Sequence, residues 1–446
     1  MWCAAMTLRE RDLQVLWHPA SHFDDHARLP PLPIARASGC WLHDLDGAPI
    51  LDAIASWWTS VHGHCHPRIV SAIAEQAARL DHVLLAGFTH EPAVALAEAL
   101  VAAAPGEYGR VFFADCGSAA VEVALKISFQ ARVLAGEGER RRFATLDNSY
   151  HGETLGALAL CGSERYREPF GPLLMPVLEL PTPDLRDHDL DDLGSDVGAR
   201  SEAADRAIAL LEAHASELSA LVVEPLAQCA GRMRMTGVGY YRRVAEAAQA
   251  LGIHVIADEI AVGFGRSGRL FASAWAGVQP EFLCLSKGLS GGVLPLAAVV
   301  VRRGLEDIFR GGPERSFLHS HTYAGNPIAC AAGLASLHLL QEGVLAGLPA
   351  RAAALRERRL RVAGASPAIR HSRQLGMIAA FEVGPPGGGP PPPRLGLELR
   401  AAALARGVLL RPLHDIVYWM PPLSIRDDEL DLLAERTLAV VREVLE

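Results

Sequence analysis

Residues 254–268 read H-V-I-A-D-E-I-A-V-G-F-G-R-S-G, and residues 282–292 read F-L-C-L-S-K-G-L-S-G-G. Each stretch starts with a short apolar run, which is typical of a fully buried β-strand, and each run ends near a charged side chain, Asp258 or Lys287. Because ligands bind at the carboxyl ends of the strands of such a sheet, both side chains are candidate site residues. The two stretches predict an α/β protein with a mainly parallel sheet.

Strands and helices alternate on the N-terminal side of this pair, as a doubly wound sheet requires. Apolar strands are expected at 111–115, 142–147 and 220–225, and helices at 119–126 and 240–250.

From about Gly333 onward, Ala/Leu/Arg-rich helices surround apparent strands at 377–383 and 408–412. This pattern predicts a smaller α+β domain. Residues 384–393, G-P-P-G-G-G-P-P-P-P, cannot continue a helix or a central strand and are expected to form an exposed loop. The polar segment 184–201 is expected to form a second one.

The composition describes a globular protein that acts on small molecules. The 446 residues carry 42 Lys+Arg against 51 Asp+Glu, a net charge of -9, which offers no basic surface to a nucleic acid or an anionic membrane. The apolar stretches are too short to span a bilayer, and the N-terminus does not resemble a signal peptide. Eight scattered cysteines indicate a reducing compartment, so we expect a cytoplasmic protein that starts at Met1 or at Met6.

Asp258 and Lys287 suit one kind of chemistry. A lysine after an apolar strand, with glycines at 288, 291 and 292 leaving space, is desolvated, which favours the neutral amine that forms a Schiff base with an aldehyde. A carboxylate nearby favours a protonated pyridine nitrogen, and this pairing indicates pyridoxal 5'-phosphate. The alternative is that Asp258 is an ordinary strand-end cap and Lys287 a solvated lysine.

Two further segments could hold such a cofactor. D-C-G-S begins where a strand ends and a helix starts, so free backbone N–H groups, the helix dipole and the Ser118 hydroxyl near Gly117 could bind a phosphate. A plain helix start with serine as the N-cap is the alternative. Tyr150 follows another strand, where its ring could stack on a cofactor ring or serve only in packing.

The segment A-S-W-W-T-S-V-H-G-H-C-H-P, residues 55–67, allows two interpretations. If it is extended, His62, His64 and His66 share one face and could bind a metal. No other clustered Cys or His supports such a site, so we expect no metal and expect backbone hydrogen bonds for the histidines. Gly63 would then help to turn the chain.

The motifs together resemble the class III, fold type I aminotransferases over nearly the whole chain. The motifs are G-S at 117, Y-H-G-E-T at 150, A-D-E at 257, G-F-G-R-S-G at 263, L-S-K-G at 285 and H-T-Y-A-G-N-P at 321. Five others are most similar to family members of biotin synthesis: W-H-P at 17, S-W-W at 56, H-G-H-x-H-P at 62, G-F-T-H-E-P-A at 87 and Y-W-M-P-P at 418.

The resemblance implies a role for each matching residue. Lys287 would bind the cofactor and move the substrate proton, Asp258 would hold the pyridinium, and Tyr150 would stack on the ring and border the substrate. The phosphate would be bound by Gly117, Ser118, His321 and Thr322, with Thr322 reaching across a homodimer interface. The remaining substrate-binding residues would be Trp57, Trp58, Arg266, Ser320, Arg411 and Tyr418, with the tryptophans as the apolar wall and Arg411 gripping a carboxylate.

The resemblance also implies the reaction and the domains. An amino group would pass from S-adenosylmethionine to the cofactor and then to 8-amino-7-oxononanoate, giving 7,8-diaminononanoate by a ping-pong mechanism. Residues 1–65 would form an N-terminal segment that contributes to the small domain and the active site. Residues 66–335 would form the large cofactor-binding domain, and residues 336–446 the C-terminal small domain.

Two departures from the family pattern leave the amino donor open. Ala20 stands where the family has a tyrosine after W-H-P, and Ser320-His321 stand where it has G-P before the threonine. An aminotransferase that uses lysine, ornithine, 4-aminobutyrate or a diamine is therefore an alternative. A non-catalytic or metal-binding α/β protein is another.

Overall fold

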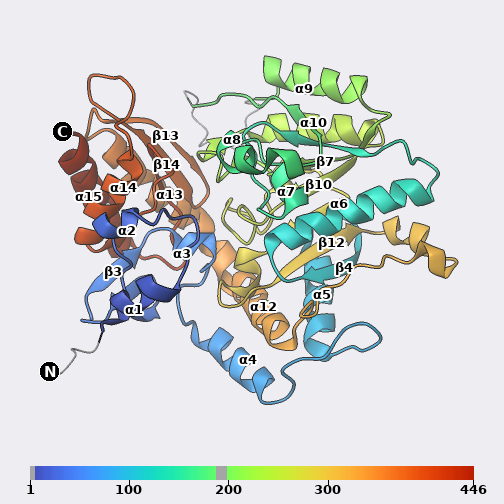
Figure 1. The fold of residues 1–446 in the computed structure, drawn as a ribbon, viewed down its shortest axis with the longest axis horizontal. Coiled ribbons are helices and arrows are strands. Elements are labelled where there is room, and N and C mark those ends of the chain that lie inside the picture. Colours follow the sequence, from blue (N-terminus) through green and yellow to red (C-terminus); the bar gives the residue numbers. More distant parts are fainter. Residues whose placement is uncertain (1–5, 187–197) are drawn as a thin grey trace.

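The computed structural model describes residues 6–186 and 198–446, and a seven-stranded sheet lies at its centre (Figure 1). Its order is β4 (Tyr108–Ala114), β12 (Ala297–Arg302), β11 (Phe282–Leu285), β10 (His254–Asp258), β7 (Leu218–Val223), β5 (Arg142–Leu146) and β6 (Val177–Leu180). Only β12 runs antiparallel to its neighbours. The predicted strands and the mainly parallel sheet are confirmed.

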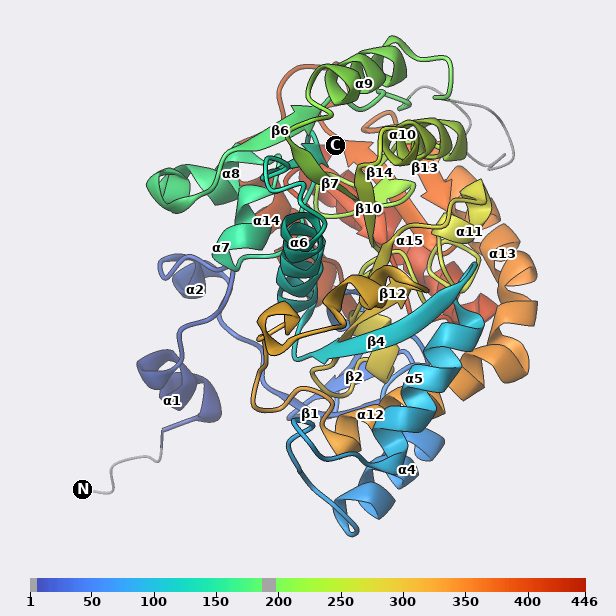
Figure 2. The same cartoon turned by 90° about the vertical axis from the view of Figure 1, so that its right-hand side faces the viewer.

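Helices cover both faces of this sheet, because successive side chains of its strands enter different apolar clusters. In β11, Cys284 packs in the cluster of α6 (Gly117–Leu134). Its neighbours Leu283 and Leu285 pack with α5 (Glu91–Ala103) and α12 (Pro327–Leu339). Figure 2 shows α6 and α5 on either side of β4 and β12. The sheet is thus doubly wound, as predicted.

Two smaller sheets lie beside the central one, together with helices of the C-terminal region (Figure 1). An antiparallel sheet contains β13 (Ile369–Leu375), β14 (Ile378–Val383) and β16 (Ile416–Trp419), and α13 (Leu345–Ala363), α14 (Leu395–Ala405) and α15 (Asp427–Leu445) pack nearby. The other contains β1 (Ile34–Ser38), β2 (Trp41–Asp44), β3 (Pro49–Asp52) and β15 (Val408–Leu409). The parallel β3–β15 pair joins a strand of the N-terminal region to a strand of the C-terminal region. The domain boundaries at 65 and 335 stay predictions.

The remaining elements cover or connect these layers, and α9 and α10 pack on strands of the central sheet. They are α1 (Leu8–Val15), α2 (Asp25–Arg28), α3 (Ala55–Trp58), α4 (Pro67–Ala77), α7 (Leu155–Ala159), α8 (Glu164–Arg167), α9 (Glu202–Ala213), α10 (Val238–Ala250), α11 (Ser273–Ala276), β8 (Ala227–Gln228), β9 (Arg234–Met235) and the short turns Glu168–Leu173, Lys287–Ser290, Leu305–Phe309, Pro313–Arg315 and Leu340–Val344. Residues 384–393 form an irregular loop, as predicted. The predicted loop 184–201 lies largely outside the described residues.

One helical run of the described residues, Pro327–Ala363, is long and apolar enough to cross a membrane by length and composition alone, with a mean hydropathy of 1.4 in its most apolar part. Its first part, α12, packs against α4, α5 and the turn that carries Lys287. Cys330 and Leu337 are both fully buried there. We interpret the run as a core element of this fold.

Candidate active site

Asp258 ends β10 and belongs to a buried polar network. Its Oδ2 lies 2.7 Å from His151 Nδ1, and its Oδ1 accepts the Ile260 N–H at 3.0 Å. The other ring nitrogen of His151 lies 3.5 Å from Thr145 Oγ1, and the imidazole is buried. These contacts fix the orientation of the Asp258 carboxylate. The sequence placed His151 next to Tyr150 but gave it no function.

Lys287 follows the end of β11, with its backbone in the left-handed region at a φ of 47°. Burial lowers the pKa of Lys287, while the carboxylates of Asp258 and Glu224 oppose that shift. Its Nζ lies 4.9 Å from the centre of the Trp58 ring. The neighbouring Gly288 has no room for a side chain, because a Cβ there would lie 2.8 Å from Phe264. The lysine is therefore held beside an aromatic wall.

Gly117 and Ser118 form the first turn of α6, close to two other segments of the site. A Cβ on Gly117 would lie 2.8 Å from Ile260, two residues beyond Asp258. Ser118 Oγ lies 2.6 Å from Thr154 Oγ1 and accepts the Thr154 N–H at 3.0 Å. A Cβ on Gly152, whose φ is 120°, would lie 2.6 Å from Ser118 Oγ. The first turn of α6 thus faces the loop that carries Tyr150.

A buried carboxylate, Glu224, anchors the Tyr150 loop. It accepts the backbone N–H of Tyr150 at 3.0 Å and that of Cys229 at 3.1 Å. Burial raises the pKa of Glu224 to about 7. Glu224 directly follows the last residue of β7, which is the one sequence signal that could have identified it. Tyr150 is half-buried and donates its hydroxyl to Glu153 at 3.0 Å.

Trp57 and Trp58 end a short left-handed helical turn, α3. The φ angles of Ala55, Ser56, Trp57 and Trp58 are 48°, 46°, 79° and 72°. For residues other than glycine this conformation costs roughly 1 to 2 kcal/mol per residue. The turn directs Trp58 inward, where it is buried near Lys287, and leaves Trp57 40% exposed.

Arg411 and Tyr418 complete the wall formed by the tryptophans. The Arg411 guanidinium stacks on the Trp57 ring at 4.4 Å and donates to the Ala20 carbonyl at 3.1 Å. Tyr418 packs edge-on against Trp58 with 6.0 Å between ring centres. Within residues 6–186 and 198–446, neither Trp58 Nε1 nor the Tyr418 hydroxyl has a hydrogen-bond partner, although both atoms are buried. The structure thus brings these predicted substrate residues together.

The buried Arg266 lies behind this wall. Its Nη1 donates to the backbone carbonyls of Met420 and Pro421, directly after β16. Burial lowers the pKa of Arg266 to about 10. Its Nε and Nη2 have no partner in the described part of the chain. A role in substrate binding stays a prediction for this residue.

The loop with Ser320, His321 and Thr322 is not joined to Ser118 by any contact in the described chain. Ser320 and Thr322 are exposed, and His321 Nδ1 lies 3.1 Å from Asp115 Oδ2. Asp115 lies just before the first turn of α6. The predicted phosphate contact of Thr322 across a dimer interface stays a prediction.

The three histidines of the 62–66 segment do not converge: the rings of His62 and His66 pack edge-on with 5.9 Å between centres, whereas His64 turns to Asp52. The segment is not extended, because Gly63 has a φ of 82° and Cys65 a φ of 53°. His62 contacts Ser336 Oγ at 3.0 Å, and His64 contacts Asp52 Oδ2 at 2.9 Å. The alternation that suggested a metal site was wrong, and the described residues contain no group of three potential metal ligands. The partners of His62 and His64 in these contacts are side chains, whereas the sequence predicted backbone hydrogen bonds, and the buried His66 Nδ1 has no partner among the described residues.

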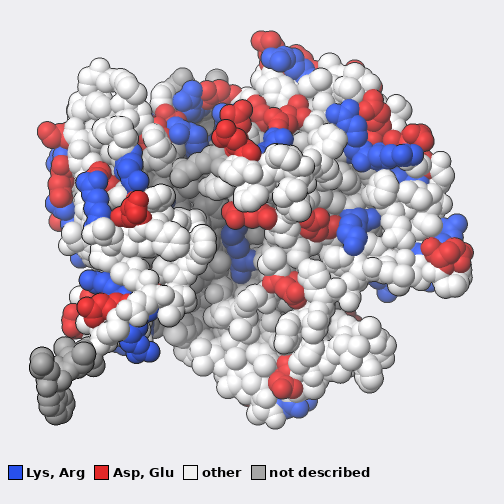
Figure 3. Space-filling view, viewed as in Figure 1, with Lys and Arg blue, Asp and Glu red and all other residues white. Residues whose placement is uncertain are grey.

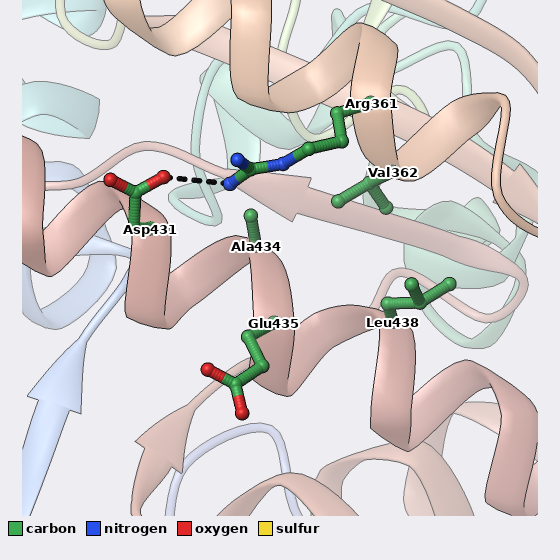
Figure 4. A pocket seen from close by; sticks show the side chains of 6 residues that line it. All are labelled: Arg361, Val362, Asp431, Ala434, Glu435 and Leu438. Carbon is green, nitrogen blue, oxygen red and sulfur yellow. Dashed lines mark hydrogen bonds and ion pairs between the residues drawn. The ribbon is translucent and has the colours of Figure 1, made fainter.

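The molecular surface is hollowed between the C-terminal elements and the central sheet, and basic side chains lie inside this hollow (Figure 3). A separate surface pocket lies between α13 and α15, where Arg361 and Asp431 form an ion pair of 2.7 Å (Figure 4). None of the residues named above lines that pocket. The candidate chemistry thus belongs to the strand ends of the central sheet and not to this pocket.

Comparisons with known proteins identify the family. The family model described as aminotransferase class-III matches residues 23–441. The adenosylmethionine-8-amino-7-oxononanoate aminotransferase of Synechococcus elongatus is 42% identical over 420 residues, 93% of this chain and 95% of that protein. The protein of the same name from Helicobacter pylori is 37% identical over 442 residues, 98% and 97% of the two chains.

Solved structures agree with the sequence relatives. The adenosylmethionine-8-amino-7-oxononanoate aminotransferase of Methanocaldococcus jannaschii has a TM-score of 0.91 at 29% identity, covering 98% of both chains. An omega transaminase of Pseudomonas jessenii in complex with PMP has a TM-score of 0.89 at 26% identity, again over 98% of both chains. With Asp258, Lys287 and the start of α6 gathered at the strand ends, this chain belongs to the class III aminotransferases, which use pyridoxal 5'-phosphate.

Proposed function

We propose that this protein catalyses the amino-group transfer of biotin synthesis, converting 8-amino-7-oxononanoate to 7,8-diaminononanoate with S-adenosylmethionine as the amino donor. The observation that carries the proposal is the wall of Trp57, Trp58 and Arg411 next to Lys287. A long-chain keto acid has a hydrocarbon chain for the indole rings and a carboxylate for the guanidinium. Relatives that carry the name of this enzyme match nearly the whole chain.

The residues fit pyridoxal 5'-phosphate. When bound, the cofactor supplies an aldehyde that reacts with amines and a ring that withdraws electrons from the substrate. The first turn of α6 offers its backbone N–H groups and Ser118 to its phosphate, and a Cβ on Gly152 would collide with Ser118 there. Asp258 is positioned to hold the ring nitrogen.

Each side chain of the site then has its own role in the reaction. Lys287 would bind the cofactor through its amine. Once the substrate amine has displaced it, the freed neutral amine would take the proton of the substrate carbon, and burial favours that neutral form. His151 orients the Asp258 carboxylate through the contact between its Nδ1 and Asp258 Oδ2. Tyr150, anchored through Glu224, would cover the ring and border the substrate.

We also propose that the enzyme is a cytoplasmic homodimer. Each active site would contain residues from both copies. Leu318 and Tyr323, which flank the loop with Thr322, are 90% and 63% exposed. Phe88, 61% exposed, lies in the adjacent loop, where His82 packs on Tyr323 with 5.1 Å between rings. A second copy covering this apolar surface would bring its Thr322 to the phosphate.

Replacing Gly152 by alanine is expected to weaken cofactor binding by at least about tenfold, because its Cβ would collide with Ser118. The matched control is Gly136→Ala, which has a similar left-handed backbone, φ 80°, but open space around its Cβ. It should cost about 1 kcal/mol of stability and leave the dissociation constant of the cofactor unchanged. Absorbance titration of the apoprotein and thermal melts measure both quantities. Equal loss of affinity in both variants would contradict the phosphate assignment.

The function is tested by two half-reactions. Mixed with S-adenosylmethionine, the loaded enzyme should lose the visible absorbance of its bound cofactor, and added 8-amino-7-oxononanoate should restore it while mass spectrometry detects the diamine. Lysine, ornithine, 4-aminobutyrate and a diamine serve as comparison donors, because Ala20 departs from the family pattern and omega transaminases share the fold. No diamine with any donor would overturn the proposed acceptor.

A further inference from the structure

The left-handed turn that carries Trp57 and Trp58 depends on one buried carboxylate, Asp52. Asp52 ends β3 and is 0% exposed. Its Oδ1 accepts the backbone N–H of Ile54 at 3.2 Å, and its Oδ2 accepts the Ser56 hydroxyl at 2.8 Å. Both donors lie at the entrance of the left-handed turn, so Asp52 ties this turn to the end of a strand.

His64 supplies a second tie from the far side of the turn. Its Nε2 lies 2.9 Å from Asp52 Oδ2 and 3.5 Å from Ser56 Oγ. The backbone of His64 is itself fixed, because it exchanges two hydrogen bonds with Gly39, of 2.7 and 3.2 Å. A Cβ on Gly63 would lie 2.9 Å from the Gly39 carbonyl oxygen, so this close approach requires a glycine.

Four consecutive left-handed residues persist only where the surroundings hold them, and the turn itself contributes three backbone hydrogen bonds. The N–H of Trp58 donates to the Ile54 carbonyl, and the N–H groups of Thr59 and Ser60 both donate to the Ala55 carbonyl. Asp52 and His64 lie outside the wall of the site, since neither contacts Lys287, Trp57 or Trp58 through its side chain in the described contacts. Their hydrogen bonds therefore reach the site through the turn, while the charge of Asp52 also acts directly on Arg266 and Tyr418, raising the pKa of each.

We propose that Asp52, acting through Ser56 and His64, positions Trp57 and Trp58 and thereby sets the fit of the acceptor's hydrocarbon chain. This inference rests on the proposed function, because it takes the indole wall as the acceptor site. Asp52 and His64 are positioning residues, and the remaining chemistry at Asp258 and Lys287 does not depend on them. Without the carboxylate, the turn relaxes toward an ordinary conformation and the two indoles move apart from Arg411 and Tyr418.

Asp52→Asn is expected to raise the KM for 8-amino-7-oxononanoate about tenfold, since it alters a buried charge-assisted contact, with a much smaller change in kcat. The cofactor dissociation constant should stay unchanged. The near-ultraviolet circular dichroism of the tryptophans should change, which reports the turn without any turnover. The matched control is Asp44→Asn, whose carboxylate caps a turn of the same sheet by accepting the N–H groups of Asp46 and Ala48, and it should behave as the parent.

Two substitutions of His64 distinguish a loss of positioning from a general loss of stability. The Gln amide of His64→Gln can still donate to Asp52 and should keep the parent KM, whereas His64→Ala should raise it. These variants also decide the question if Asp52→Asn does not fold. Unchanged KM and unchanged circular dichroism in His64→Ala would overturn the inference. If the parent makes no diamine at all, the proposed function fails instead, and the circular dichroism still tests whether Asp52 and His64 hold the turn.

Discussion

Replacing Lys287 by alanine is expected to lower kcat of the loaded enzyme by about 10⁴-fold, the upper range for the loss of a general base. The amine sits at the end of β11 beside Trp58, and burial lowers its pKa, so part of the population is neutral at a pH where an ordinary lysine is charged. No other lysine can replace it, because the sequence contains only Lys126 and Lys287. Single-turnover kinetics at saturating cofactor measure the loss.

The scarcity of lysines also gives a sharp control. Borohydride reduction of the loaded protein should attach the cofactor to the peptide that contains Lys287, and peptide mass spectrometry separates it from the peptide of Lys126. Lys126 pairs with His319 at 2.9 Å on the surface of α6, so Lys126→Arg should keep both the adduct and the activity. An adduct on Lys126, or normal turnover by Lys287→Ala, would contradict the assignment.

The residues that sequence predicted best are those that chain topology alone brings together. Asp258 and Lys287 each follow a buried strand, and parallel neighbours place their carboxyl ends at one edge. The start of α6 follows the same rule. The apolar runs were therefore enough to predict both the strands of the sheet and the edge at which Asp258 and Lys287 lie.

The residues that sequence missed act through contacts that no local pattern encodes. His151 meets Asp258 across 107 positions of sequence, and Glu224 meets the Tyr150 N–H across 74. The left-handed turn is the clearest case, because bulky residues such as Trp57 rarely adopt a positive φ and the pattern gave no reason to expect it. The histidine alternation was wrong for the same reason, since it assumed an extended backbone.

Asp258→Asn is expected to lower kcat/KM by about 10- to 1,000-fold, because an opposite charge shifts the pKa of a partner by roughly 1 to 3 units. The carboxylate favours a protonated ring nitrogen, and an amide of the same shape removes that charge while keeping the packing. His151 would remain beside it, so the geometry is disturbed little. The comparison of rates at saturating cofactor isolates the electronic effect from weaker binding.

The matched control is Asp147→Asn, which changes a carboxylate directly after β5, on the same sheet but bonded to Thr182 and far less buried. It should leave the rate within about threefold of the parent, as most surface changes do. The ring nitrogen can also be observed directly: in protein loaded with nitrogen-15 cofactor, its chemical shift should be that of a protonated pyridine in the parent and of a neutral one in Asp258→Asn. A protonated ring in both would show that Asp258 is a strand-end cap, with its charge irrelevant to the cofactor.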